Sequence, residues 1–243
     1  MDGVMGEIEW LESESEPKLL FKYKKVTTTL DLSRFCDSLK ENRIYFSKPS
    51  NLNDSMEGMG TDLIGGVAAG LETLKDNYRV LALSESCFSP VMWSHYADNR
   101  SGICLGFIKG NPLDNNNTSA FKTAEKVKYV YNRNEFSSDT KQTIENDLYY
   151  KNSDWSYERE WRIVKETNEY YIAYNRSDLA CIIFGEKTDE MIKELIMNSF
   201  PDISFYCIES EPKKYRLVIR NLSTHKLIDG VNELFNDIEK ASK

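Results

Sequence analysis

Short strand-like segments, some alternating between apolar and polar residues and some continuously apolar, recur along this chain and are not regularly interleaved with helices. Such segments include LLFKYKKV at 19–26, GICLGFI at 102–108, LACIIFG at 179–185 and YRLVIRN at 215–221. Helical spacing is confined to a few stretches, among them 30–42, 188–200 and the last fifteen residues. Because a doubly wound α/β protein would alternate the two kinds of element, this pattern favours an α+β fold.

The composition narrows the class of function. With 39 acidic and 31 basic residues among 243, the chain has a formal net charge of −8, which argues against a dedicated DNA-binding domain. Five widely spaced cysteines without a CxxC pair, and only two histidines, predict reduced thiols in a cytoplasmic protein and no metal site. No apolar run approaches the roughly 18 residues of a membrane span, so no membrane partner is expected. We expect residues 1–17 to form a flexible acidic leader and 18–243 a single domain.

The stretch SYEREWRIV, residues 156–164, concentrates charge on one face of a predicted strand. Alternating side chains would place Glu158, Glu160 and Arg162 on one face, and Trp161 and Ile163 on the other, in the core. On a solvated strand such charges form weak cross-strand pairs. In a cleft, one carboxylate could orient a sugar hydroxyl while the other acts as acid or base. The spacing leaves both interpretations open.

A polar loop and the opening strand add further candidate site residues. In NLNDSMEG, Asn53 and Asp54 follow a strand and a proline, where such residues form turns or line the mouth of a cleft. In FKYKK, Lys22 and Tyr23 lie on opposite faces of the opening strand, which taken alone is an ordinary amphipathic strand.

The segment MWSHYADNRSG, residues 92–102, contains one of the two histidines beside two aromatic residues. On a short helix, Trp93 and Tyr96 would pack inward. His95 is then either a hydrogen-bonded packing residue or a group that contacts a ligand or acts in catalysis. No nucleophile elbow of the hydrolase type is present.

Several of these motifs together resemble a bacterial family, domain-of-unknown-function family 2971. The resemblance rests on FKY, IYFSKPSNLNDSMEG, CFS, MWSHYADNRSGICLGF, VKYV, the spacing of Lys151 and Trp155, and YEREWR in this order, and extends from about residue 19 to residue 186. More distantly, the order of elements looks like the ADP-ribosyltransferase plan. That resemblance implies a largely antiparallel split sheet flanked by helices.

The ADP-ribosyltransferase resemblance also implies a function and a set of roles. The opening strand would hold NAD through Tyr23 or Lys22, residues 84–89 would form the middle strand, and Glu160 would be the key carboxylate with Glu158 beside it. His95 would join the catalytic residues. NAD contacts would come from Tyr23, Lys22, Asn53, Asp54, Trp93, Tyr96 and Arg162. The opening strand has no Arg or His, which departs from the plan.

Such enzymes cleave NAD and transfer ADP-ribose to a protein or nucleic acid, and in bacteria they act as toxins or in phage defence, restrained by a neutralising partner. Two alternatives remain open from the sequence. One is a non-catalytic nucleotide- or protein-binding module of the same fold. The other is a metal-dependent hydrolase or nuclease that would use Asp54, Glu57, Glu158 and Glu160 as magnesium ligands.

Overall fold

A computed structural model of the chain describes residues 16–54, 75–110, 119–131, 144 and 147–241. Nearly all of the predicted acidic leader therefore lies outside the described residues, and so does Glu57. The strands are β1 (Leu19–Lys24), β2 (Arg43–Tyr45), β3 (Tyr78–Ser84), β4 (Ile103–Ile108), β5 (Glu125–Lys126), β6 (Lys128–Val130), β7 (Tyr150–Asn152), β8 (Glu160–Glu166), β9 (Tyr171–Ala173), β10 (Leu179–Phe184), β11 (Ser204–Ser210), β12 (Leu217–Asn221) and β13 (Leu227–Ile228).

The α-helices are fewer than the strands. They are α1 (Thr29–Lys40), α3 (Pro90–Tyr96), α5 (Glu190–Ser199) and α6 (Val231–Ala241), with the 3-10 turns η1 (Pro49–Asn51), η2 (Ser153–Glu158) and η3 (Arg176–Asp178).

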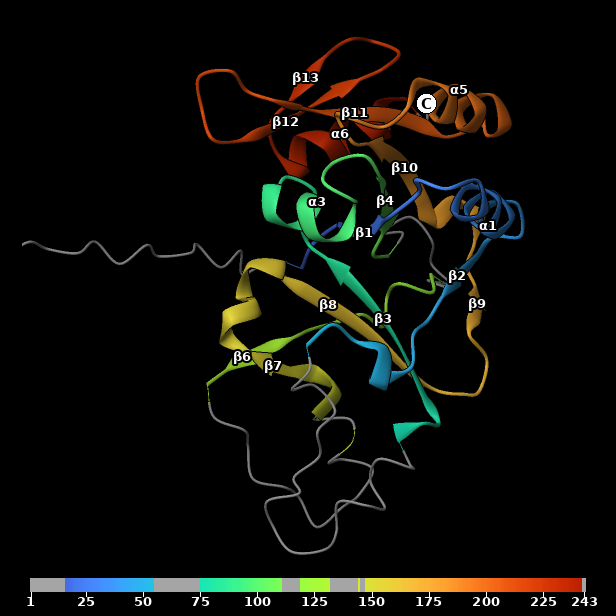
Figure 1. The fold of residues 1–243 in the computed structure, drawn as a ribbon, viewed down its shortest axis with the longest axis vertical. Helices are drawn as coiled ribbons and strands as arrows, with labels where there is room; N and C mark the ends of the chain where they lie inside the picture. Colours follow the sequence, from blue (N-terminus) through green and yellow to red (C-terminus); the bar gives the residue numbers. More distant parts are fainter. Residues whose placement is uncertain (1–15, 55–74, 111–118, 132–143, 145–146, 242–243) are drawn as a thin grey trace, which may run out of the picture.

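One large sheet organises the molecule (Figure 1). Its nine strands run in the order β13-β12-β11-β10-β4-β1-β3-β8-β5, and two further pairs, β2–β9 and β6–β7, form small sheets of their own. Neighbours in the large sheet are antiparallel except β10 and β11, which are parallel. The predicted α+β class with a largely antiparallel sheet is confirmed.

Helices cover both faces of the large sheet because its strands are apolar on both sides (Figure 1). Along β1, Leu20 belongs to one core cluster, together with buried residues of α1 and α5. Its neighbours Leu19 and Phe21 belong to the other, together with residues of α3 and α6. This alternation is the two-residue period of a strand buried on both faces.

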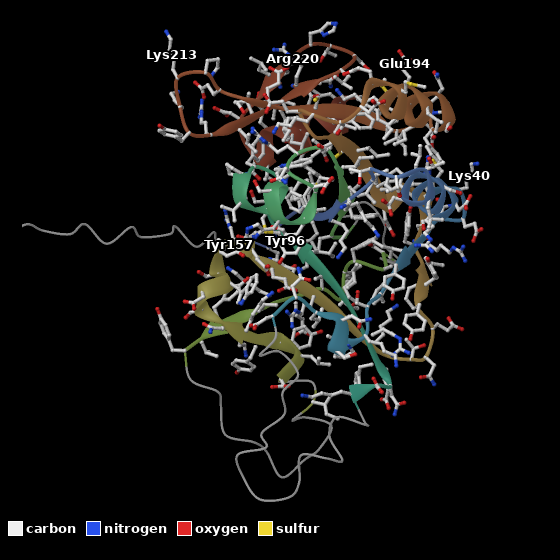
Figure 2. All side chains as sticks on the ribbon, viewed as in Figure 1. Lys40, Tyr96, Tyr157, Glu194, Lys213 and Arg220 are labelled. Atoms are coloured by element: carbon white, nitrogen blue, oxygen red, sulfur yellow. The ribbon has the colours of Figure 1, made fainter. Side chains whose placement is uncertain are left out.

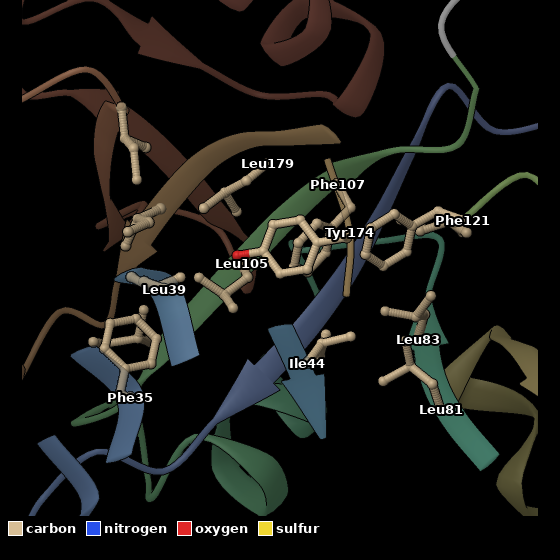
Figure 3. Packing of buried hydrophobic residues seen from close by; sticks show 14 of the residues in the cluster. Phe35, Leu39, Ile44, Leu81, Leu83, Leu105, Phe107, Phe121, Tyr174 and Leu179 are labelled. Carbon is tan, nitrogen blue, oxygen red and sulfur yellow. The ribbon is translucent and has the colours of Figure 1, made fainter. Parts of the chain in front are cut away.

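The prediction that one face of the strand at 160–164 packs in the core is confirmed. Trp161 and Ile163 are buried in the cluster that also contains Leu81 and Leu83 of the neighbouring strand (Figure 3). All five cysteines are free, and all but Cys207 are buried. None of the helices in the described ranges is long and apolar enough to cross a membrane.

Candidate functional site

A cavity of about 170 Å³ lies where the large sheet is most weakly joined. Strand β1 pairs with β4 over six positions, but it pairs with β3 only at Phe21 opposite Ser84. Residues of both β1 and β3 line the cavity, together with the segment from Ser47 to Asn53, part of α3, and the charged groups of β7 and β8. The gap in strand pairing therefore leaves space for a pocket in the middle of the sheet.

Seven of the ten residues predicted from the sequence line this cavity. They are Lys22, Tyr23, Asn53, Tyr96, Glu158, Glu160 and Arg162. The remaining three are His95, Asp54 and Trp93, which lie outside the lining.

The predicted strand at 156–164 begins later than expected. Residues 153–158 form the turn η2, and Arg159 then adopts the left-handed backbone conformation, with φ of 48°, before β8 starts at Glu160. Glu158 is thus not part of the strand, which corrects the alternation assumed for it. The two carboxylates nevertheless converge, because both bind the ammonium group of Lys151.

Four buried charges form a closed network in the cavity wall. Lys151 Nζ lies 2.5 Å from Glu158 Oε2 and 3.0 Å from Glu160 Oε2. Arg162 donates to Glu160 twice, from Nε at 2.7 Å and from Nη2 at 2.9 Å, and its Nη1 donates to the Leu148 carbonyl. All four side chains are at least nine-tenths buried. Because two cations face two anions, the network is neutral and the burial of each charge is compensated.

The two glutamates differ in which groups hold their oxygens. Both oxygens of Glu160 are held by Arg162, and one is also held by Lys151. Glu158 binds Lys151 through one oxygen and accepts a hydrogen bond from the Tyr96 hydroxyl through the other. Tyr96 is only half-buried, so Glu158 contacts a side chain that is itself partly exposed to solvent.

The surroundings move the pKa values of the two glutamates in opposite directions. Burial would raise the pKa of Glu160, but Arg162 and Lys151 outweigh burial and lower it to about 2. Burial raises the pKa of Glu158, and the negative charge of Glu160 adds to this effect, while Lys151 opposes it. Glu160 is therefore a fixed anion, and Glu158 is the group suited to exchange a proton.

Acid is expected to weaken the fold through Glu160. Its pKa falls from an ordinary value of 4.5 to about 2 on folding, so its contribution is fully present above pH 4.5 and is lost as the pH falls toward 2. The difference corresponds to roughly 3 kcal/mol of unfolding free energy. Urea unfolding of wild type and Glu160→Gln between pH 6 and pH 2 measures this directly. We expect the stability gap between the two proteins to shrink as the pH falls, and a gap that stays constant would contradict the assignment.

The opening strand contributes a lysine and a tyrosine whose polar atoms are already engaged. Lys22 Nζ donates to the Ala82 carbonyl across the β1–β3 gap at 2.8 Å, and burial together with Lys24 lowers its pKa to about 8. The Tyr23 hydroxyl donates to the Ser86 carbonyl at 2.9 Å. Both residues line the cavity, and Lys22 supplies a positive charge there below about pH 8.

Trp93 packs inward, as expected on a short helix, which leaves the NAD contact implied for it by the resemblance without support. Its side chain is fully buried, its indole nitrogen donates to the Cys87 carbonyl, and its ring packs edge-on against Tyr23. It therefore supports the cavity wall from behind and has no face open to a ligand.

His95 and Asp54 lie beside the cavity without lining it. His95 is exposed on α3, and its Nδ1 lies 3.4 Å from the Tyr157 hydroxyl; Figure 2 shows Tyr157 and Tyr96 near one another on this side of the molecule. Asp54 is buried. The catalytic role of His95 and the NAD contact of Asp54 stay predictions.

Lys151 is the central residue of this network, and the sequence marked it only through its spacing to Trp155 among the family motifs, without a role in the site. The packing of β7 against η2 brings it to Glu158 and Glu160. Within the described ranges, no group of three or more His, Cys, Asp or Glu side chains is placed to hold a metal ion.

A comparison with protein families matches the part of the chain that carries this network. Residues 92–163 match the model described as protein of unknown function (DUF2971). The DUF2971 match covers Tyr96, Lys151, Glu158, Glu160 and Arg162 but not β1, and it is narrower than the 19–186 range that the motifs indicate. No curated protein and no solved structure was found to match the chain.

Proposed function

We propose that this protein cleaves the nicotinamide–ribose bond of NAD and transfers ADP-ribose to a macromolecular target. The observation that supports the proposal is the pair of glutamates with opposite pKa shifts in one cavity between β1 and β3. Opposed shifts of neighbouring carboxyl groups are characteristic of sites that handle protons and charge. NAD as the substrate, a macromolecular target and a neutralising partner are proposed from the resemblance of the sequence to ADP-ribosyltransferases.

The volume of the cavity indicates which part of the NAD molecule fits inside it. Sites for whole drug-sized ligands are usually about 300–1,000 Å³, whereas this cavity is about 170 Å³. It therefore suits one ring and its ribose, and the rest of the dinucleotide would extend toward the solvent. We place the nicotinamide ribose in the cavity because the carboxylates are there.

The reaction breaks the C1′–N bond of the nicotinamide ribose. The bonding electron pair leaves on the ring nitrogen, which gives neutral nicotinamide, and positive charge develops on the ribose. An acceptor atom of the target, or water, then bonds to C1′ and releases a proton. A carboxylate beside the ribose stabilises the charged transition state more than the ground state, which is the condition for a faster reaction.

Within this proposal the contacts favour Glu158 as the catalytic carboxylate. Both oxygens of Glu160 are held by the cations Arg162 and Lys151, whereas one oxygen of Glu158 is held only by the neutral hydroxyl of Tyr96. Glu160 therefore acts as a positioning residue that fixes Lys151. Glu158 is positioned by Lys151 and Tyr96, and its raised pKa lets it accept the proton that the acceptor releases. The resemblance alone had given the key role to Glu160.

The second candidate is a binding module that holds a nucleotide without cleaving it. The neutrality of the four-charge network favours it, because a charge-balanced buried network is also a way to stabilise a fold. The same cavity would then recognise a ribose through Glu158 and Lys22 without any reaction.

Incubation of the purified protein with NAD separates the two candidates. For the enzyme we expect a rise in melting temperature with NAD and the appearance of free nicotinamide, with labelled ADP-ribose transferred to a component of a cell lysate. A rise in melting temperature without nicotinamide indicates the binding module. If NAD changes neither quantity, both proposals fail for this ligand.

A further inference from the structure

A second and larger cavity of about 460 Å³ shares no lining residue with the first, although the first is lined by the middle of β1 and the second by its end. It is enclosed by the end of β1, the helix α1, the β2–β9 pair and strand β4. Figure 3 shows several of its apolar lining residues, including Phe35, Leu39, Leu105 and Phe107. Its volume falls in the range of about 300–1,000 Å³ that is usual for small-molecule sites.

The charge of this cavity is opposite to that of the whole chain. Four basic residues line it, Lys24, Lys25, Arg34 and Arg43, against the single acid Asp31, although the chain carries −8 overall. Asp31 is already engaged, since its carboxylate accepts from the backbone and hydroxyl of Thr28 at the start of α1.

Two of the four basic groups have no acidic partner in the described part of the chain. Lys25 pairs with Asp98, and Arg43 pairs with Glu41 and lies over the Tyr171 ring. Lys24 and Arg34 form no ion pair with a described residue. Burial lowers the pKa of Lys24, so an anion in the cavity would relieve the cost of keeping that group charged.

A buried hydroxyl in the cavity wall also lacks a partner. Tyr174 is 7% exposed, and its hydroxyl oxygen has no hydrogen-bond partner among the described groups. Figure 3 shows the oxygen directed toward Leu105, another lining residue. Burial raises the pKa of Tyr174 to about 12, so the hydroxyl keeps its proton and can donate. A buried donor without an acceptor is costly, and a ligand that accepts a hydrogen bond would remove this cost.

We propose that this second cavity binds a small molecule that combines a planar ring with an anionic group. The anionic group lies against Lys24 and Arg34, and the ring packs against the aromatic side chains of Tyr45, Tyr171 and Phe107. The Tyr174 hydroxyl donates to an acceptor on the ligand. The site is separate from the glutamate cavity and does not depend on NAD cleavage.

Inosine monophosphate is a suitable probe, because it joins a planar ring to a phosphate and is neither half of NAD. We expect calorimetric titration to show binding, with inosine and inorganic phosphate each at least about tenfold weaker. Tyr174→Phe and Arg34→Gln are each expected to weaken binding about tenfold, which corresponds to one lost hydrogen bond or ion contact. Both variants should keep the wild-type melting temperature, since Arg34 is exposed and the Tyr174 hydroxyl is unpaired.

Two control variants make the result specific. Lys40→Gln removes a positive charge from the same helix at an exposed position outside the cavity lining (Figure 2), and it should leave the affinity unchanged. Glu158→Gln should also leave it unchanged. The proposal is overturned if the probe does not bind, if Tyr174→Phe and Arg34→Gln bind it like wild type, or if Glu158→Gln abolishes binding.

Discussion

Replacing Glu158 with glutamine is expected to reduce nicotinamide release from NAD at least a hundredfold and to leave the protein folded. The loss follows from removing a negative charge beside the developing positive charge of the ribose, where one well-placed group contributes several kcal/mol at about 1.4 kcal/mol per tenfold. The fold should survive because glutamine keeps the volume of Glu158 and can still form hydrogen bonds, and Lys151 keeps its contact with Glu160. The measurement is the initial rate of nicotinamide release, with the melting temperature as the check on folding.

Glu85→Gln is the matched control for this experiment. Glu85 is also largely buried and ion-paired, with Arg159, but it does not line the cavity. It should keep the wild-type rate. Equal rates for wild type and Glu158→Gln would refute the catalytic role of Glu158, even if NAD is cleaved.

Replacing Arg162 with methionine is expected to destabilise the protein by about 3–5 kcal/mol. The Arg162 side chain is fully buried and supplies two of the three hydrogen bonds that Glu160 receives from cations. Without it, a buried carboxylate is left with only Lys151 to balance it. Urea unfolding at pH 7 gives the free energy, and the midpoint should fall without a change in slope.

Two further variants show that the effect comes from the buried charge. Arg159→Met, three residues earlier, removes an ion pair in which the arginine is 48% exposed, and it should cost less than about 1 kcal/mol. Adding Glu160→Gln to Arg162→Met should restore part of the lost stability, because the unpaired charge is then gone. A double variant that loses the full sum of both single effects would contradict the network.

The core face of β8 could be read from the sequence, whereas the network on its other face could be read only in part. Alternation alone places Trp161 and Ile163 inside and Glu160 with Arg162 on the opposite face, because the period of two is a local property of a strand. The left-handed turn at Arg159 has no comparable signal: arginine rarely adopts that conformation, and no glycine or asparagine marks it.

The sequence does not indicate which residues come together when separate segments pack against each other. Lys151 reaches the glutamates because a short parallel pair, β6–β7, holds it next to η2, and nothing near Lys151 indicates such a pair. The burial of Trp93, by contrast, follows from local spacing, because the short helix turns its side chain into the core as the sequence predicts. Only the NAD contact that the resemblance implies for Trp93 lacks support.

Because β1 and β3 pair at a single position, the large sheet is divided there into two parts. Six strands lie on the β1 side of this weak pairing and three on the β3 side. Separating β1 from β4 would break pairing at six positions, whereas the hydrogen bonds that join β1 to β3 and the residues just after it are the Phe21–Ser84 pairing and the bonds from Lys22 to Ala82 and from Tyr23 to Ser86. The backbone of β3 farther along the strand is held instead by Ser47, which exchanges two hydrogen bonds with Val80. The two parts of the sheet are therefore held together at the glutamate cavity mainly by the buried core that they share and by these few bonds, and not by a ladder of paired strands.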